Sequence, residues 1–209
     1  MIANEEEARA FVAARCDETA IARLDRLVAA LREENQRQNL VARPTLDSVW
    51  QRHIADSAQL LDHVPRETAL WLDLGSGAGM PGLIIAAMRP EWVVVLVESR
   101  RKRIEWLERM AGELALPNCR IEGGRLEQME SVAAGVISAR AFAPLDRIVT
   151  LSARFSTSDT LWLLPKGRSA AQELAALPKR QRALFHVEQS RTDLEAGIIV
   201  GHLAGKAGS

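Results

Sequence analysis

The sequence predicts an α/β fold in which helices cover both faces of a mostly parallel sheet. A short apolar run at residues 71–74 leads into a glycine-rich loop, and a helical pattern begins directly after that loop. Residues 93–97 read VVVLV, which is typical of a parallel strand that is buried on both faces. Strand and helix patterns then alternate, and this alternation predicts a parallel sheet with right-handed crossovers.

Composition limits the class of protein. The chain has 209 residues, of which 47% are hydrophobic and 26% charged, as in a globular protein that is not embedded in a membrane. Its net charge of zero argues against a general nucleic-acid binder but allows a local basic face. Cys16 and Cys119 lie far apart, without metal-ligand spacing, so we expect no metal and a reducing cytoplasm. The acidic start of the chain does not resemble a signal peptide.

Two units are expected, a helical extension over residues 1–64 and a core over residues 65–209. Apolar residues recur at helical spacing over 3–14 and 17–35, which predicts two amphipathic helices. A third helix is predicted over 48–61, with Thr45 or Asp47 as its cap. None of these patterns indicates an oligomer. We therefore expect a monomer.

The core is predicted as five successive strands followed by a hairpin. Strands are expected over residues 69–74, 93–97, 119–124, 135–141 and 160–164, with a closing antiparallel pair over 183–189 and 197–203. Helices are expected between them over residues 83–88, 100–114, 145–155 and 172–177.

The glycine loop allows two interpretations and a bland alternative. Gly77, Gly79 and Gly82 match the dinucleotide-binding pattern, and Glu98 follows at a suitable distance for a ribose. Asp73 precedes Gly75 and gives D-x-G-x-G instead, which resembles the first motif of S-adenosylmethionine (SAM)-dependent methyltransferases with a Rossmann-like fold. An acid there suits the cationic methionine end of SAM and would suit a pyrophosphate badly. The loop as a simple connector is the remaining alternative.

Polar residues at the ends of other strands point to the same crevice. Glu98 ends the second strand and is interpreted as a ribose ligand, with a helix-capping acid as the alternative. Arg140 and Lys166 end the fourth and fifth strands, and Arg140 suits either a ligand contact or a structural ion pair. After the third strand, Leu126 and Glu127 lie where an adenine ring would be read.

The helix predicted over 48–61 carries another polar group. Arg52, Asp56 and Gln59 lie about one turn apart, and His53 is the next residue after Arg52. A single histidine on an amphipathic helix is more often packed than catalytic, and spacing alone does not place it near the glycine loop.

Seven segments together resemble one family. They are NLVA near Asn39, RHIADS from Arg52, LDLGSGAGMPGL, ESRRKRIEWL from Glu98, GRLEQ from Gly124, SARAFAPL from Ser138 and LPKG from Leu164. In this order they resemble the small-subunit ribosomal RNA guanine-N7 methyltransferases, also called the glucose-inhibited division protein B family. The resemblance spans roughly residues 39–203.

The resemblance implies methyl transfer from SAM to N7 of one guanine in 16S ribosomal RNA, free or within the small subunit. It implies a cofactor site formed by Asp73, Gly75, Gly77, Gly79, Met80, Glu98, Leu126, Glu127 and Arg140. It further implies reaction or RNA-side roles for Arg140, His53, Lys166, Arg52, Asp56 and Ser57, and we add Arg101, from the basic cluster at residues 100–103, as an RNA contact. Two alternatives remain. An NAD-dependent oxidoreductase would need a hydride-transfer partner such as a Tyr-Lys pair, and the chain has no Tyr; a non-catalytic RNA-binding protein is the other.

Overall fold

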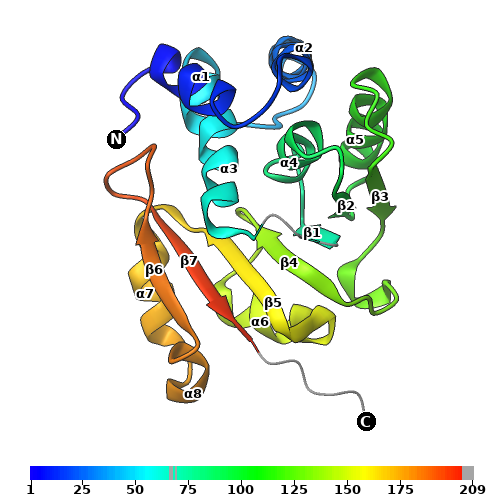
Figure 1. The fold of residues 1–209 in the computed structure, drawn as a ribbon. Coiled ribbons are helices and arrows are strands. Elements are labelled where there is room, and N and C mark those ends of the chain that lie inside the picture. The colour runs from blue at the N-terminus through cyan, green and yellow to red at the C-terminus, as the bar shows by residue number, and fades with distance from the viewer. Residues whose placement is uncertain (66–67, 69, 204–209) are drawn as a thin grey trace.

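The computed structural model describes residues 1–65, 68 and 70–203. Seven strands form one sheet in the order β3-β2-β1-β4-β5-β7-β6 (Figure 1). Their bounds are β1 Leu70–Leu74, β2 Val93–Glu98, β3 Cys119–Gly123, β4 Ala134–Ala139, β5 Ser156–Pro165, β6 Phe185–Gln189 and β7 Gly197–His202. The strands from β1 to β5 pair in parallel, and β7 is antiparallel to both β5 and β6. The predicted fold, a mostly parallel sheet with a C-terminal antiparallel hairpin, is confirmed. Ala69, predicted as the first strand residue, lies outside the described residues.

Helices connect the strands and cover both faces. The α-helices are α1 Glu5–Ala13, α2 Glu18–Glu34, α3 Asp56–Ala58, α4 Gly82–Met88, α5 Arg101–Glu113, α6 Leu145–Ser152, α7 Ala170–Ala176 and α8 Lys179–Arg182. Short 3-10 helices are η1 Arg43–Ser48, η3 Gln59–His63, η4 Leu126–Gln128, η5 Ala153–Phe155 and η6 Gly167–Ser169, and η2 Trp50–Ala55 is a π-helix. No helix was expected at α8, which is a single turn of four residues.

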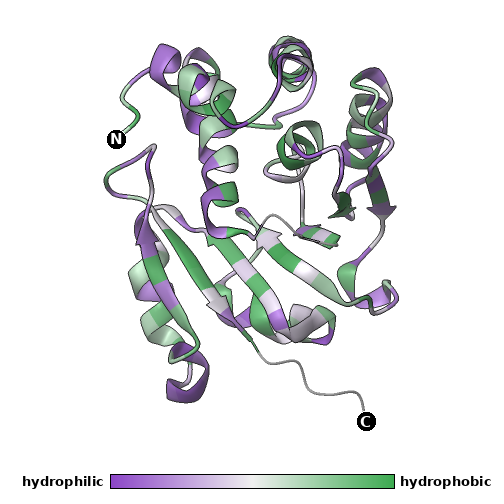
Figure 2. Cartoon of the chain, viewed as in Figure 1, coloured by the Kyte–Doolittle hydropathy of each residue, from purple (hydrophilic) through white to green (hydrophobic). Residues whose placement is uncertain are grey.

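The core has two halves, one on each face of the sheet. Successive strand side chains point to opposite faces, so Trp71 packs in one half with α1, α2, α4 and α5, while Leu72 packs in the other with α6 and α7. The strands in the middle of the sheet are coloured hydrophobic along much of their length (Figure 2). Residues from both faces of β2 are buried, as the VVVLV run predicted.

The N-terminal helices belong to the first half of the core. Leu24, Leu27 and Leu31 of α2 have no exposed surface and share a hydrophobic cluster with Leu83 of α4 and Leu107 of α5. Burial of such side chains contributes roughly 1.5–3 kcal/mol each. A boundary between two units at residue 65 stays a prediction.

The segment predicted as a helix over residues 48–61 is helical throughout, but it is not one regular α-helix, and its predicted cap is wrong. Thr45 and Asp47 lie in η1, and in the described chain neither side chain caps the helical segment that follows. Instead the Glu5 carboxylate accepts hydrogen bonds from the backbone N–H groups of Trp50 and Gln51, at 3.0 and 2.7 Å. The capping acid therefore comes from α1, and the segment runs through η2, α3 and η3 in succession.

In the described part of the chain, no helix has the length and apolar character needed to cross a membrane.

Candidate functional site

Four predicted site residues lie together because neighbouring parallel strands end at one edge of the sheet. Leu74 is in register with Val97 of β2 and with Ala139 of β4, and Ser138 of β4 is in register with Leu163 of β5. The residues at or just beyond these strand ends are Asp73, Glu98, Arg140 and Lys166. In open α/β sheets, ligands bind in the crevice at this edge.

The loop after β1 needs its glycines. Gly75 has a φ of +64°, and a Cβ built there would lie 2.3 Å from Cδ2 of Phe142. Gly79 has a φ of +93°, and its Cβ would lie 2.3 Å from Cδ1 of Leu83. Side chains are therefore excluded by both backbone conformation and space, because Phe142 and Leu83 pack against the loop. Gly75 and Gly77 keep partial exposure, whereas Gly79 is buried.

Asp73 is sealed inside the protein. Its carboxylate has no exposed surface, accepts a hydrogen bond from the Ser138 hydroxyl at 2.7 Å and another from the Gly82 N–H at 3.2 Å. Burial raises the pKa of Asp73 to about 6 against the opposing effect of these hydrogen bonds. The residue ties the two ends of the glycine loop to β4, and its contact with a cofactor stays a prediction.

Glu98 holds backbone amides of two segments. One carboxylate oxygen accepts from Gly77 N–H at 3.0 Å, and the other accepts from Ser99 and Arg100 N–H at 2.7 and 2.9 Å. Ser99 and Arg100 precede α5, so these bonds hold the loop before the helix and cap none of its N–H groups. The same carboxylate lines a cavity of about 190 Å³ together with Gly75 and Phe142, and its role as a ribose ligand stays a prediction.

A second cavity continues the first toward β3. It measures about 150 Å³ and shares Val97 and Gly124 with the cavity at Glu98. Gln128 and Met129 also line it. The predicted adenine contacts are placed differently: Leu126 is buried in the core and Glu127 is exposed. Sequence reasoning missed Gln128 and Met129, because the chain turns into η4 at this point.

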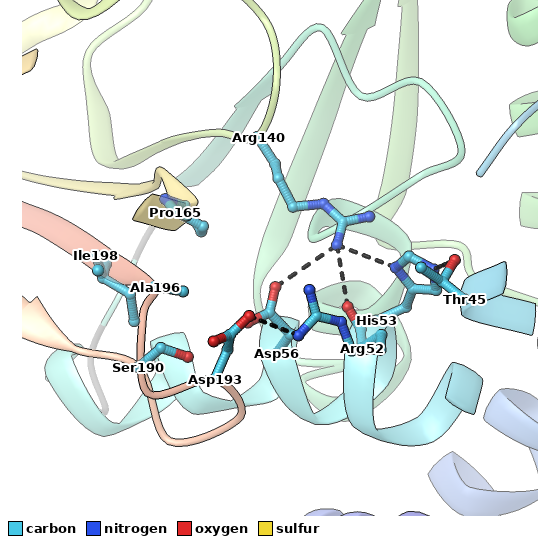
Figure 3. Close-up of a pocket in the computed structure, with 12 residues that line it drawn as sticks. Thr45, Arg52, His53, Asp56, Arg140, Pro165, Ser190, Asp193, Ala196 and Ile198 are labelled. Atoms are coloured by element: carbon cyan, nitrogen blue, oxygen red, sulfur yellow. Dashed lines mark hydrogen bonds and ion pairs between the residues drawn. The ribbon is translucent and has the colours of Figure 1, made fainter. Parts of the chain in front are cut away.

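Arg140 lies at the centre of a polar cluster (Figure 3). Its guanidinium is 3.2 Å from Nδ1 of His53 and 3.6 Å from the Asp56 carboxylate, and it donates to the Arg52 carbonyl at 3.5 Å. A further contact, 3.2 Å long, joins it to the sulfur of Met80 on the glycine loop. Arg140 thus connects the helical segment η2 with the loop after β1.

The contacts of His53 define its protonation. Because the arginine can only donate, Nδ1 of His53 must accept, and Nε2 therefore carries the proton and donates to the Thr45 hydroxyl at 2.7 Å. Thr45 in turn donates to the Ala42 carbonyl at 2.7 Å. Burial, with the charges of Arg140 and Arg52, lowers the pKa of His53 to about 3, so the ring is neutral at physiological pH and serves as an acceptor for Arg140.

The structure places the other predicted RNA-side residues apart. Arg52 pairs with Asp193 at 2.7 Å on the rim of the Figure 3 cavity. Ser57 is buried and donates to the His53 carbonyl at 2.7 Å, which is a helix-internal contact. Arg101 is 92% exposed and pairs with Glu105 one turn later on α5. Of these residues, the structure brings only Arg52 to the Arg140 cluster, together with Asp56.

Lys166 has an acidic partner that sequence reasoning did not identify. Its ammonium group donates to the Ala143 carbonyl at 2.7 Å and pairs with Glu173 of α7 at 2.8 Å. Burial of Glu173 opposes its ionisation, but hydrogen bonds from Lys166 and Ser169 outweigh this and hold its pKa below the ordinary value. Neither Glu173 nor Asp193 stands in a local motif, so the sequence carried no signal for either.

Among the described residues, no group of three or more His, Cys, Asp or Glu side chains is placed so that it could hold a metal ion. The arrangement suits a small organic ligand, held beside a half-buried arginine whose charge is compensated by Asp56.

Comparisons with known proteins agree with this geometry. The sequence model of the family described as rRNA small subunit methyltransferase G matches residues 20–197. The ribosomal RNA small subunit methyltransferase G of Erythrobacter litoralis is 66% identical over 201 residues, which cover 96% of this chain and 97% of that protein. The enzyme of the same name from Novosphingobium aromaticivorans is 57% identical, with 98% of this chain and 91% of that protein covered.

Solved structures share the fold at low sequence identity. A SAM-dependent methyltransferase from Aquifex aeolicus aligns with a TM-score of 0.59 and 11% identity, covering 84% of this chain and 97% of that one. A TehB-like SAM-dependent methyltransferase from Corynebacterium glutamicum aligns with a TM-score of 0.56 and 16% identity, covering 84% and 99%. At these identities the likeness concerns the fold alone.

Proposed function

The chain belongs to the rRNA small subunit methyltransferase G family, and on this premise we propose that it transfers the methyl group of SAM to N7 of a guanine in 16S ribosomal RNA. The observation that carries the proposal is the convergence of the glycine loop, Glu98 and Arg140 at one edge of the sheet. The protein is proposed to act as a cytoplasmic monomer on ribosomal RNA or on the small subunit.

The residues at the strand edge fit SAM. The two joined cavities of about 190 and 150 Å³ extend from Gly75 past Glu98 to Met129, which suits an elongated ligand. Glu98 is a carboxylate at the end of β2, and the acceptor position that its three backbone hydrogen bonds leave can take a ribose hydroxyl. The buried charge of Asp73, together with Gly75, Gly77, Gly79 and Met80, would favour the cationic methionine end. Bound there, SAM supplies an electrophilic methyl group on a sulfonium.

The chemistry needs positioning more than proton transfer. Guanine N7 has a lone pair and no proton, so it can form the new N–C bond while the S–C bond breaks and its electron pair goes to sulfur. No general base is required, which agrees with His53, whose pKa is lowered to about 3 and whose two ring nitrogens are occupied by Arg140 and Thr45. We propose that Arg140 orients the reactants and that His53 and Asp56 fix its guanidinium. Holding reactants in line is itself a large contribution to rate.

Charge compensation matters because the purine becomes cationic as it is methylated. Arg140 and Lys166 would repel that charge if they stood alone, but Asp56 and Glu173 lie beside them at 3.6 and 2.8 Å. Arg52 and Arg101 are the proposed contacts with RNA phosphates, since arginine side chains suit such contacts. Ser57 takes part only through the helix that carries His53.

The test is a pair of measurements on the full chain. Calorimetric titration should give micromolar binding of SAM and none of NAD. Incubation with SAM and 16S ribosomal RNA, free or in small subunits, should yield 7-methylguanine at one position when the RNA is mapped by mass spectrometry. Binding of NAD alone would support the oxidoreductase alternative, and SAM binding without methylation of either RNA form would support a non-catalytic RNA-binding protein.

A further inference from the structure

The largest cavity at the site lies beside the cofactor region, between the loop after β4 and α7. It measures about 740 Å³, within the range of small-molecule sites. Arg140 lines both this cavity and the one in Figure 3, while Ala141 and Phe142 also line the cavity at Glu98. A ligand here would therefore lie next to the cofactor region, because Ala141 and Phe142 line both cavities.

The polar wall of this cavity includes the ion pair of Lys166 and Glu173, beside Arg140, Ser169 and Gln172. Two of the three ammonium hydrogens of Lys166 have partners in the described chain, the Ala143 carbonyl and Glu173. Glu173 accepts from Leu145 N–H at 3.0 Å and Ser169 hydroxyl at 2.7 Å as well. A carboxylate has about four acceptor positions. The pair therefore still offers one donor beside one acceptor.

Guanine presents the complementary pair of groups. Going round its ring from N7, it shows the O6 acceptor and then the N1–H donor, whereas adenine shows an N6 donor and then the N1 acceptor. We propose that the cavity holds the guanine to be methylated, with Lys166 donating to O6 and Glu173 accepting from N1–H. Adenine in the same orientation would set donor against donor and acceptor against acceptor. Phe142, Pro144 and Pro165 supply the apolar walls against which the ring stacks.

The same contact would act in the reaction as well as in recognition. Methylation at N7 spreads positive charge over the purine and makes N1–H a stronger acid. The hydrogen bond from N1–H to the Glu173 carboxylate therefore strengthens as the new N–C bond forms. An interaction that is stronger in the transition state than in the ground state raises the rate. This inference rests on the proposed function and deepens it by naming how the base is selected.

Base analogues in the RNA test the contacts without altering the protein. The mapped target guanine is replaced by 2-aminopurine, which keeps N7 but lacks O6 and N1–H, or by inosine, which keeps all three and lacks only the 2-amino group. We expect 2-aminopurine to be methylated on the order of 100-fold more slowly, because buried polar groups would be left unpaired. Inosine should stay within about threefold of guanine, since no proposed contact involves its missing group.

A substitution of Glu173 tests whether this residue causes the preference for guanine over 2-aminopurine. Glu173→Ala should slow methylation of guanine strongly and reduce the preference for guanine over 2-aminopurine to about tenfold or less. Its SAM affinity should match the wild type, because Glu173 does not line the cavity at Glu98. Glu91→Gln is the control, because Glu91 is an exposed acid just before the start of β2, at the end of the strands opposite to the site.

The outcomes separate this inference from the proposed function. If the wild type methylates guanine and 2-aminopurine equally fast, the contacts to O6 and N1–H are refuted and the methyltransferase function stands. If no 7-methylguanine forms in unsubstituted RNA, the proposed function itself fails. Should Glu173→Ala not fold, the analogue series on the wild type still decides. An unchanged preference in a folded, SAM-binding Glu173→Ala would remove Glu173 from recognition.

Discussion

Asp73→Asn separates the structural and cofactor-binding roles of the buried acid. The Asp73 carboxylate is enclosed by Ser138 and Gly82, and its pKa is raised from 3.8 to about 6, first of all by burial. An asparagine has nearly the same shape and can accept one of the two hydrogen bonds while carrying no charge. Any change that depends on pH then reports the ionisation of this one group.

The magnitude follows from the two pKa values. A rise from 3.8 to about 6 corresponds to about 3 kcal/mol of the free energy of unfolding. Because the folded pKa lies above the unfolded one, the contribution of the neutral carboxyl is fully present below about pH 4 and is lost as the pH rises through about 6. The wild type should therefore lose about 2.5 kcal/mol relative to Asp73→Asn between pH 4 and pH 7.5, because a small part of the effect is already lost at pH 4.

Urea unfolding of both proteins across this pH range measures the difference. Asp159→Asn, the same change at an exposed position, is the control, and its difference from the wild type should stay nearly constant. A difference between the wild type and Asp73→Asn that is flat within about 1 kcal/mol over pH 4–7.5 would refute the reasoning from burial.

SAM titrations test the second role of Asp73. If the carboxylate compensates the positive charges of SAM, binding favours its ionised form, and wild-type affinity should rise between pH 5 and pH 7. The affinity of Asp73→Asn should then be weaker and nearly independent of pH. Equal affinity of the two proteins at pH 7.5 would remove Asp73 from the cofactor site and leave it as a structural acid that fixes the glycine loop.

Three further substitutions probe the site. His53→Ala removes the acceptor for Arg140, and single-turnover methylation should slow by about tenfold or more at unchanged SAM affinity; wild-type turnover would contradict the positioning role. Glu98→Ala leaves the N–H groups of Gly77, Ser99 and Arg100 without their acceptor, so calorimetry should show SAM affinity reduced by about tenfold or more. The control is Glu105→Ala at an exposed position, and unchanged SAM affinity of Glu98→Ala would contradict the cofactor role of Glu98. Gly75→Ala should lower the free energy of unfolding by about 2 kcal/mol, because φ is +64° and Phe142 is too close. Gly112→Ala, in α5 with open space around it, should instead raise that free energy by about 0.5–1 kcal/mol; equal effects of the two alanines in urea unfolding would argue against the contact with Phe142.

The sequence determined the elements and their order because these depend on local patterns. The β-branched run at residues 93–97 could only be stable as a strand covered on both faces, and the glycine loop follows β1 as its spacing required. Once the strands are parallel neighbours, Asp73, Glu98, Arg140 and Lys166 must meet at one edge of the sheet. Their convergence was therefore predictable.

Only the tertiary structure decided how these residues are paired. Arg140 meets His53, Arg52 pairs with Asp193, and Lys166 pairs with Glu173, across 87, 141 and 7 residues of chain. Such pairs leave no periodicity in the sequence, since each depends on how η2, the β6–β7 hairpin and α7 pack on the sheet. The Glu5 carboxylate at the start of η2 shows the same limit, because a cap from a distant helix replaced the local one that the sequence favoured.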